Sequence, residues 1–249
     1  MEILGSYHNH TKYSKFFHGK NTVKEMCDKA KEVGFVQIAL TDHASKHIFG
    51  VWPKKVKKLR EEIDEYNKST DEINVLMGME FNLLGINGES DFSEEVAENL
   101  DIRCLGFHKL GNTGWKGFFT FLLPNMFCKK KMIEKNTDAY IKAIKKYKID
   151  LITHPQDYIK VNLKRLAEAC VENNCYLELN NRHNKVKKDE ILEILDTGVK
   201  FLISTDAHSI KTINSFERAQ KLIEESGIPL ERVANIGALP DFKNKYTRD

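Results

Sequence analysis

Short apolar runs alternate along the chain with longer segments whose apolar residues recur at helical spacing. The apolar runs are nearly continuous, as is typical of parallel strands that are covered on both faces. They predict seven strands, over residues 3–8, 35–41, 74–80, 102–108, 149–154, 176–180 and 199–205.

Amphipathic segments that are typical of helices lie between and after these strands. The first begins at a capping box formed by Thr22 and Glu25 and ends at Gly34. The others span residues 54–66, 93–100, 137–147, 163–173, 188–195 and 215–225. Strands that alternate with helices form parallel sheets, and no Pro/Gly-rich linker divides the chain. The pattern therefore predicts one α/β domain over residues 1–249, folded as a closed or nearly closed TIM-like barrel.

Residues 115–131 interrupt this alternation. The segment contains Trp115 and four phenylalanines, ends in three lysines, and lies in a connection that is long for a loop between a strand and a helix. Two interpretations stay open. The segment is either an additional packed helix or oligomer contact, or a lid over a site at this end of the barrel.

The composition narrows the class of protein. The chain has 249 residues, of which 41% are hydrophobic, and its 39 basic and 36 acidic residues leave a formal net charge of +3. This excludes a disordered chain, which has few apolar residues and a high net charge. It also excludes a strongly basic DNA-binding domain. The lysine clusters fall mainly on predicted helices and are interpreted as solvated outer faces.

The cysteines indicate the compartment. There are five, an odd number, and they contain no Cys-x-x-Cys pair. We therefore expect reduced thiols in a cytoplasmic protein, and no cysteine-ligated metal. The most apolar stretch, residues 115–128, is too short to span a bilayer, and the first residues do not resemble a targeting signal. No membrane partner is expected, and the oligomeric state stays open.

The predicted strands end in side chains that bind metals. These are His8 and His10, Asp42 and His43, Glu80, His108, His154, and Asp206 and His208. The carboxyl ends of parallel strands lie on one face of a barrel, where active sites are built. In the pair His8 and His10 both side chains leave the same side of a strand. We therefore expect the set to converge.

The chemistry of the set points to metal ions. A single histidine at a strand end is more often a hydrogen-bonded core or surface residue, but a set on successive strands favours a site. Imidazole and carboxylate without thiolate suit Zn²⁺, Mn²⁺ or Fe²⁺. The ligands are too many for one ion and indicate two or three, with Glu80 placed to bridge. His47 and His183 are interpreted as loop residues that could line the pocket.

In this order the strand-end motifs resemble those of the PHP (polymerase and histidinol phosphatase) family. They are His8-Asn9-His10-Thr11, Thr41-Asp42-His43, Glu80, Gly106-Phe107-His108, Thr153-His154-Pro155, Glu178-Leu179-Asn180-Asn181 and Ser204-Thr205-Asp206-Ala207-His208. The resemblance runs from residue 3 to about residue 237. It is closest to the small stand-alone PHP phosphatases with a trinuclear zinc site, and it implies a distorted (β/α)₇ barrel.

The resemblance also implies a ligand set. The first ion would be held by His8, His10, Glu80 and Asp206. Glu80 would bridge to a second ion held by His108 and His154. A third would be held by His18, His43 and His208. Two features depart from the small phosphatases: residues 109–135 are longer, and Gln156-Asp157 replaces the small residues often found after His-Pro.

Clustered cations suit the hydrolysis of phosphoesters, whose transition state spreads negative charge over several oxygens. A metal-activated hydroxide would attack phosphorus, and Asp206 or a loop acid would shuttle the proton. Asp42 would orient a ligand. Arg182 and Lys109 follow site strands and are candidates to bind phosphate, with simple solvation as the alternative.

Three other functions are alternatives to a phosphatase. A PHP nuclease acting on nucleic-acid ends would need a basic groove, which a net charge of +3 does not demand. An inactive metal-binding interaction module would have no need of a complete ligand set. An amidohydrolase-type barrel shares the His-x-His but uses a carboxylated lysine. We therefore expect a small phosphorylated substrate rather than nucleic acid, and histidinol phosphate is one candidate.

Overall fold

The computed structural model describes residues 1–244 and 246 of the chain. Seven parallel strands form one sheet in the order of the sequence. They are β1 (Gly5–Ser6), β2 (Gln37–Leu40), β3 (Asn74–Asn82), β4 (Ile102–Gly106), β5 (Leu151–Ile152), β6 (Tyr176–Asn180) and β7 (Phe201–Ser204).

The sheet curves until its first and last strands meet. Beyond β1 and β7, Asn9 pairs with Ala207 in a parallel bridge, and the amide of His10 donates to the carbonyl of Ala207 at 2.8 Å. The barrel is therefore nearly closed, which confirms the distorted (β/α)₇ barrel predicted from the sequence.

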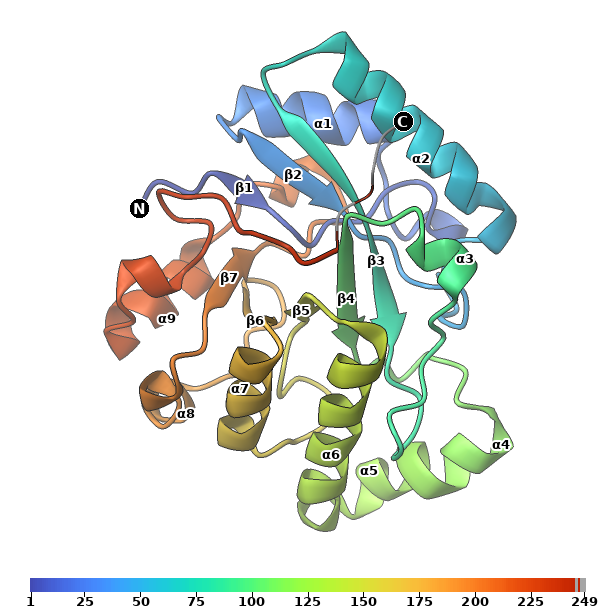
Figure 1. The fold of residues 1–249 in the computed structure, drawn as a ribbon, viewed down its shortest axis with the longest axis vertical. Coiled ribbons are helices and arrows are strands. Elements are labelled where there is room, and N and C mark those ends of the chain that lie inside the picture. The colour runs from blue at the N-terminus through green and yellow to red at the C-terminus, as the bar shows by residue number, and fades with distance from the viewer. Residues whose placement is uncertain (245, 247–249) are drawn as a thin grey trace.

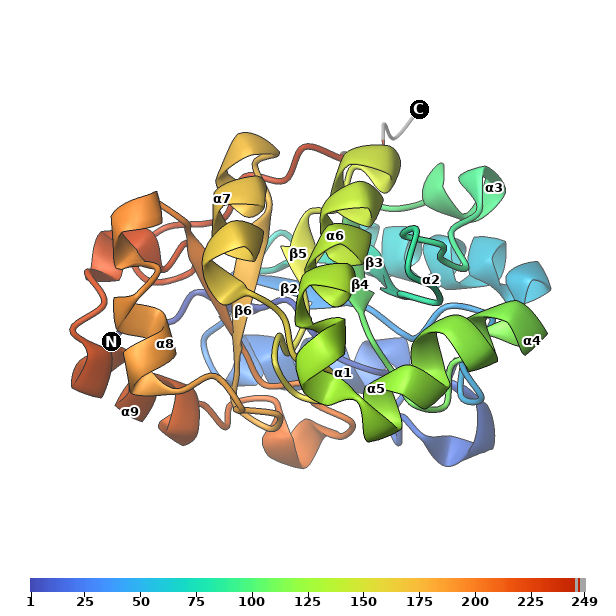
Figure 2. The same cartoon turned by 90° about the horizontal axis from the view of Figure 1, so that it is seen from below.

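Helices surround the barrel (Figures 1 and 2). They are α1 (Val23–Glu32), α2 (Val56–Ser69), α3 (Glu94–Ala97), α4 (Gly114–Gly117), α5 (Leu123–Phe127), α6 (Lys129–Tyr147), α7 (Leu163–Glu172), α8 (Lys188–Leu192) and α9 (Glu217–Ser226). The capping box predicted for α1 is present, because Thr22 Oγ1 accepts from Glu25 N and Thr22 N donates to Glu25 Oε2. Among the described residues, none of these helices is both long and apolar enough to cross a bilayer.

Buried side chains form two layers. The larger layer fills the space between the strands and the helices. The smaller one comprises Tyr7, Ala39, Leu76, Ile102, Cys104, Leu151, Tyr176, Leu202 and Phe242. Since every strand or its continuation contributes to this smaller cluster, it fills the interior of the barrel. Phe242, from the C-terminal segment, packs against Tyr7 and Tyr176 with ring centroids 5.4 and 5.8 Å away.

Every second side chain of a strand points to the same face, so the inward-facing positions can be followed along β2 and β3 to the site. Ala39 on β2 and Leu76 on β3 point into the barrel. Counting on by twos leads to His43 and to Glu80, near the carboxyl ends of the same strands. The sequence thus directs these two side chains toward the barrel axis, above the apolar layer.

Most elements differ by a few residues from their predicted extents, and three differences bear on the architecture. The first strand, predicted over residues 3–8, is shorter because Ile3 pairs antiparallel with Ile236 of the C-terminal segment. Helix α6 begins at Lys129, eight residues before the predicted start, because residues 129–136 include good helix formers and bury Met132 and Asn136. Residues 114–127 are helical, so the segment that interrupts the alternation is an additional helix.

Candidate metal centre

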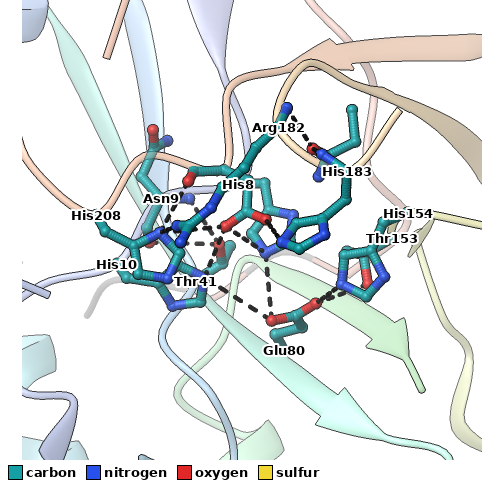
Figure 3. Close-up of polar contacts among 12 residues, drawn as sticks. His8, Asn9, His10, Thr41, Glu80, Thr153, His154, Arg182, His183 and His208 are labelled. Carbon is teal, nitrogen blue, oxygen red and sulfur yellow. Dashed lines mark hydrogen bonds and ion pairs between the residues drawn. The ribbon is translucent and has the colours of Figure 1, made fainter. Parts of the chain in front are cut away.

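All nine histidines of the chain come together at the carboxyl end of the barrel. Each ring is within contact distance of another histidine ring, and the nine form one connected network. Several line a cavity of about 330 Å³ together with Glu80 and Asp206. The nine predicted ligands therefore share one place in the fold, and Figure 3 shows many of them.

Glu80 lies at the centre of this network, and its two carboxylate oxygens face different histidines. Oε2 is 3.2 Å from Nε2 of His8 and 2.8 Å from Nδ1 of His43. Oε1 is 2.9 Å from Nε2 of His154 and 3.2 Å from Nε2 of His108. One carboxylate thus separates two groups of nitrogen donors, which is the arrangement of a bridging ligand.

Asp206 faces a third group. Its Oδ1 is 3.3 Å from Nε2 of His10, 3.8 Å from Nε2 of His8 and 3.4 Å from Nδ1 of His208. The other ring nitrogen of His208, Nε2, lies 2.7 Å from Nε2 of His18. His18 therefore joins the site despite its position in the loop after β1.

The donor atoms fit divalent cations. Six of them are buried and have no hydrogen-bond partner in the described residues, although carboxylates lie within 4 Å of most of them. They are His8 Nε2, His10 Nδ1 and Nε2, His43 Nδ1, Glu80 Oε2 and Asp206 Oδ1. A buried polar atom without a partner is costly. With one nitrogen taken from each ring, His8, His10 and Asp206 offer donor atoms that lie close enough together to surround an ion. Four groups of three such side chains have donor atoms within 4.8 Å of one another.

Burial and charge prepare these groups for ligation. Burial lowers the pKa of His10 and His43 well below the ordinary histidine value, and it lowers the pKa of His18 to about 4. Neutral imidazole, the form that binds metal, is therefore favoured at these positions. Burial also opposes the charged form of His8, but the surrounding Glu80, Glu178 and Asp206 raise its pKa well above the ordinary value. The carboxylates around His8 therefore favour its charged form, and a bound cation would take the place of that positive charge.

Polar side chains around the ligands fix their orientation. Glu178 Oε1 is 2.8 Å from Nδ1 of His8, and Asn82 Oδ1 is 2.8 Å from Nδ1 of His108. The hydroxyl of Thr153 donates to Glu80 Oε1 at 2.7 Å. Such contacts hold a ligating imidazole by its other nitrogen and raise its affinity for metal. Glu178 belongs to one of the sequence motifs, which gave it no role, and in the structure it lies behind His8.

A glycine and two unusual backbone conformations shape the same region. A β-carbon at Gly106 would lie 2.4 Å from Thr153 Oγ1 and 3.0 Å from Glu80 Oε1, so only glycine leaves room for them. His154 and Asp206 have φ values of 29° and 51°, in the left-handed region that side chains other than glycine seldom adopt. Strained backbone of this kind gathers at functional sites.

Asp42 is fully buried beside His43, but its hydrogen bonds go to the loop after β1. Its carboxylate accepts from the amide and hydroxyl of Thr11, at 2.8 and 2.6 Å, and from the hydroxyl of Ser14 at 2.5 Å. Burial raises its pKa to about 6, against the effect of these hydrogen bonds. Asp42 thus anchors the loop that leads to His18.

The two candidate phosphate-binding residues lie at the rim. Arg182 is exposed, and its guanidinium contacts Nδ1 of His208. Lys109 is also exposed, with Nζ 5.3 Å from the centre of the Tyr158 ring. Both side chains line the cavity that contains Glu80.

The structure adds two histidines that sequence reasoning assigned to loops. His47 is buried, and its ring centre lies 3.9 Å from that of His43. His183 lies between two carboxylates, with Nδ1 2.9 Å from Asp157 Oδ2 and Nε2 3.6 Å from Asp206 Oδ2. Neither residue lies at a strand end, so strand-end counting could not find them, although the surplus of histidine was a signal.

The fold and site together define a TIM-like barrel with a candidate polynuclear metal centre at the carboxyl ends of its strands. The chain belongs to the PHP domain family, whose model matches residues 6–182.

Relatives in other organisms cover nearly all of the chain. A probable phosphatase of Acetivibrio thermocellus is 27% identical over 243 residues, which are 94% of this chain and 92% of the relative. A probable phosphatase of Proteus mirabilis is 28% identical over 239 residues, which are 92% of this chain and 88% of the relative.

Two solved structures share the fold. One is the histidinol phosphate phosphatase of Lactococcus lactis, solved in complex with zinc, L-histidinol and phosphate. Its TM-score is 0.61 at 16% identity, with 92% of this chain and 95% of that one covered. The other is a putative histidinol phosphatase of Listeria monocytogenes, with a TM-score of 0.56 at 15% identity, covering 85% of this chain and 97% of that one.

Proposed function

We propose that this protein is a metal-dependent phosphoric monoester hydrolase that binds two or three divalent cations, with Zn²⁺ favoured and Mn²⁺ or Fe²⁺ as alternatives. The observation that carries the proposal is the placement of Glu80, whose Oε1 faces His108 and His154 while its Oε2 faces His8. The phosphatase names of the relatives and the zinc and phosphate bound to the Lactococcus structure support it.

The proposed ligands divide into three sets. The first ion would be held by His8, His10, Glu80 and Asp206. The second would be held by Glu80, His108 and His154. The third would be held by His18, His43 and His208. When bound, such ions stabilise negative charge on phosphoryl oxygens and lower the pKa of an attacking water.

The chain's own residues act around the phosphoryl group. Arg182 and Lys109, the cations at the rim, bind phosphate oxygens and orient the ester. Asp206 accepts the proton of the attacking water, and its Oδ2 faces the ring of His183 at 3.6 Å, which gives the proton a path away. Asp42 keeps the loop after β1 in place and so positions His18.

The alcohol part of the substrate has a separate place. A second cavity, of about 510 Å³, adjoins the site through Arg182, Asp206 and His208. Its wall carries the cations Lys20 and Arg218 and several hydroxyl groups, and its only carboxylate among the described residues is that of Asp206. This lining favours an alcohol with hydroxyl groups or a second negative charge over one with a free ammonium group such as histidinol.

A panel of substrates tests the proposed reaction. Phosphate release should be measured from p-nitrophenyl phosphate, histidinol phosphate and sugar bisphosphates, and cleavage from bis-p-nitrophenyl phosphate and short oligonucleotides. We expect monoesters to be hydrolysed, chelation to stop the reaction, and added Zn²⁺ or Mn²⁺ to restore it. Cleavage of oligonucleotides without hydrolysis of any monoester would contradict the proposal and favour a nuclease.

A further inference from the structure

Residues 114–127 form a helical rod on which four of the five aromatic side chains are exposed. The rod comprises α4, the π-helical turn over 118–122 and α5, and the backbone is helical at both junctions. Its buried residues are Gly117, Phe121 and Asn125, which recur every four residues, and Leu122 beside them is partly buried against the same core. Phe121 packs on Phe107 with ring centroids 5.4 Å apart. This narrow stripe is sufficient to attach the rod to the barrel.

The outward side of the rod is largely aromatic. Trp115 is 82% exposed, Phe119 58% and Phe127 75%. The rings of Trp115 and Phe119 stack with centroids 6.2 Å apart, and Phe118 meets Phe119 at 5.1 Å. We call these residues, together with Met126, the aromatic face. Soluble proteins seldom expose so many large apolar side chains on one short segment, and exposed apolar patches mark binding surfaces.

Lysines flank the aromatic face in the sequence. Between residues 109 and 135 the sequence has six lysines and a single acidic residue, Glu134. The carboxylate of Glu134 is ion-paired with Arg165. Lys129, Lys130 and Lys131 directly follow the rod, are exposed, and have no ion pair in the described part of the chain. The surface therefore combines a large apolar area with unneutralised positive charge.

We propose that the aromatic face is a docking surface for an anionic lipid bilayer. An amphipathic helix with aromatic residues on one side and lysines beside them lies in the headgroup layer of such membranes. The rod has too few residues to span a bilayer, so it would lie in the plane of the membrane. A second copy of this chain is a poorer partner, because symmetric association would bring two positive surfaces together.

Docking would bring the metal centre close to the membrane. The amide of Ile48 donates to the carbonyl of Leu110 at 3.2 Å, and the side chains of both residues are about half exposed. Leu110 also lines the cavity of the metal centre and precedes the rod in the chain. In Figures 1 and 2, α4 and α5 lie at the edge of the molecule. The proposal goes beyond the expectation drawn from the sequence, which could not show which side of the helix is buried.

The test uses the full chain and vesicles. Sedimentation should be measured with vesicles of phosphatidylcholine alone and of phosphatidylcholine mixed with phosphatidylglycerol. We expect binding to the mixed vesicles that weakens as salt rises. In a Trp52→Phe variant the remaining Trp115 should shift its fluorescence to the blue when the vesicles are added.

Variants identify the surface. Phe119→Glu and Phe127→Glu should each lower the affinity for mixed vesicles about tenfold or more, since each puts a negative charge in the headgroup layer. Replacing Lys129, Lys130 and Lys131 by Gln should cost about fivefold per lysine. Leu192→Glu, at a similarly exposed apolar residue on α8, is the matched control and should bind normally. Unchanged melting temperatures would show that the variants fold.

Three results would overturn the proposal. They are no binding to mixed vesicles, equal binding to neutral vesicles, or loss of binding in Leu192→Glu as large as in Phe127→Glu. A dimer seen by light scattering that dissociates in Phe119→Glu and Phe127→Glu would instead show that this face joins two copies of the chain. Hydrolysis is not needed for any of these measurements.

Discussion

The carboxylate of Glu178 lies directly behind His8. Its Oε1 is 2.8 Å from Nδ1 of the ring, while Nε2 of the same ring faces Glu80 at 3.2 Å and Asp206 at 3.8 Å. Both side chains are fully buried. The ring is therefore fixed with one nitrogen toward the proposed ions and the other on a carboxylate, which is the usual support for a metal-ligating histidine.

This relationship predicts the effect of replacing Glu178. Glu178→Ala should lower the affinity for Zn²⁺ about 10-fold to 100-fold, because His8 loses both its orientation and a negative neighbour. Glu178→Gln, which can still accept a hydrogen bond, should lie between this variant and the wild type. Metal affinity is measured by competition with a chelating dye, with exposed Glu193→Ala as the control. Equal affinity in all four proteins would contradict the role given to Glu178.

His18 and His47 should differ in their effect on the number of bound ions. His18 Nε2 faces His208 Nε2 at 2.7 Å, so His18→Ala should remove one ion per chain. His47 Nδ1 accepts a hydrogen bond from the amide of Phe49 at 3.3 Å. In the neutral ring Nε2 therefore carries the proton and has no lone pair to offer a metal ion. His47→Ala should therefore keep all ions. Elemental analysis of the purified variants decides, and loss of an ion only in His47→Ala would reverse the assignment.

Arg182 and Arg218 should bind different parts of the substrate. Arg182→Ala should raise the KM for every phosphomonoester about tenfold, because it removes a charged hydrogen bond to phosphate. Arg218→Ala should raise the KM only for substrates whose alcohol carries a second negative charge. Steady-state kinetics on p-nitrophenyl phosphate and a sugar bisphosphate separate the two effects. A similar rise in KM for both substrates in Arg218→Ala would remove Arg218 from the proposed alcohol site.

The buried carboxyl group of Asp150, at the opposite end of the barrel, should make the free energy of unfolding depend on pH. It is fully buried, and burial raises its pKa to about 6 from the ordinary value of 3.8, against its hydrogen bonds to Asn244 and Arg103. The folded protein therefore holds this proton more tightly than the unfolded chain does. The stability it contributes is present at low pH and is lost as the pH rises through about 6.

The size of this effect can be measured against a variant. Between pH 5 and 8 the wild type should lose on the order of 1 kcal/mol of unfolding free energy relative to Asp150→Asn, which does not titrate. Urea unfolding of both proteins at each pH gives the difference and cancels the contribution of the metal centre. The exposed Asp71→Asn variant is the control. Parallel pH profiles for wild type and Asp150→Asn would show that Asp150 does not titrate in this way.

The sequence could bring the proposed ligands to one place because their positions depend on few features. His43, Glu80 and Asp206 follow buried strands, and the ends of parallel strands meet on one face whatever the loops do. The same reasoning could not reach His47 or His183. Their approach to the site depends on loop contacts, such as the bridge from His47 to Gly111 and the ion pair from His183 to Asp157.

Which side of an element is buried was harder to predict than the element itself. The apolar spacing of residues 115–127 fits a helix, but the packed side is that of Phe121 and Asn125 while Trp115 and Phe127 face outward. The hydrogen bond between Asn125 and Asn136 that joins the rod to α6 has no signature in the sequence. Periodicity defines the axis of a helix, and only the tertiary structure selects its inner side.

Titration of the metal-free protein with Zn²⁺ tests the central proposal most directly. Phosphate release from p-nitrophenyl phosphate should be recorded at each addition, together with the number of ions bound, for the wild type and Glu80→Gln. We predict that activity appears as two to three ions bind per chain, and that Glu80→Gln binds fewer ions and stays inactive. Hydrolysis that persists without metal, or fewer than one ion bound per chain in excess Zn²⁺, would contradict the account.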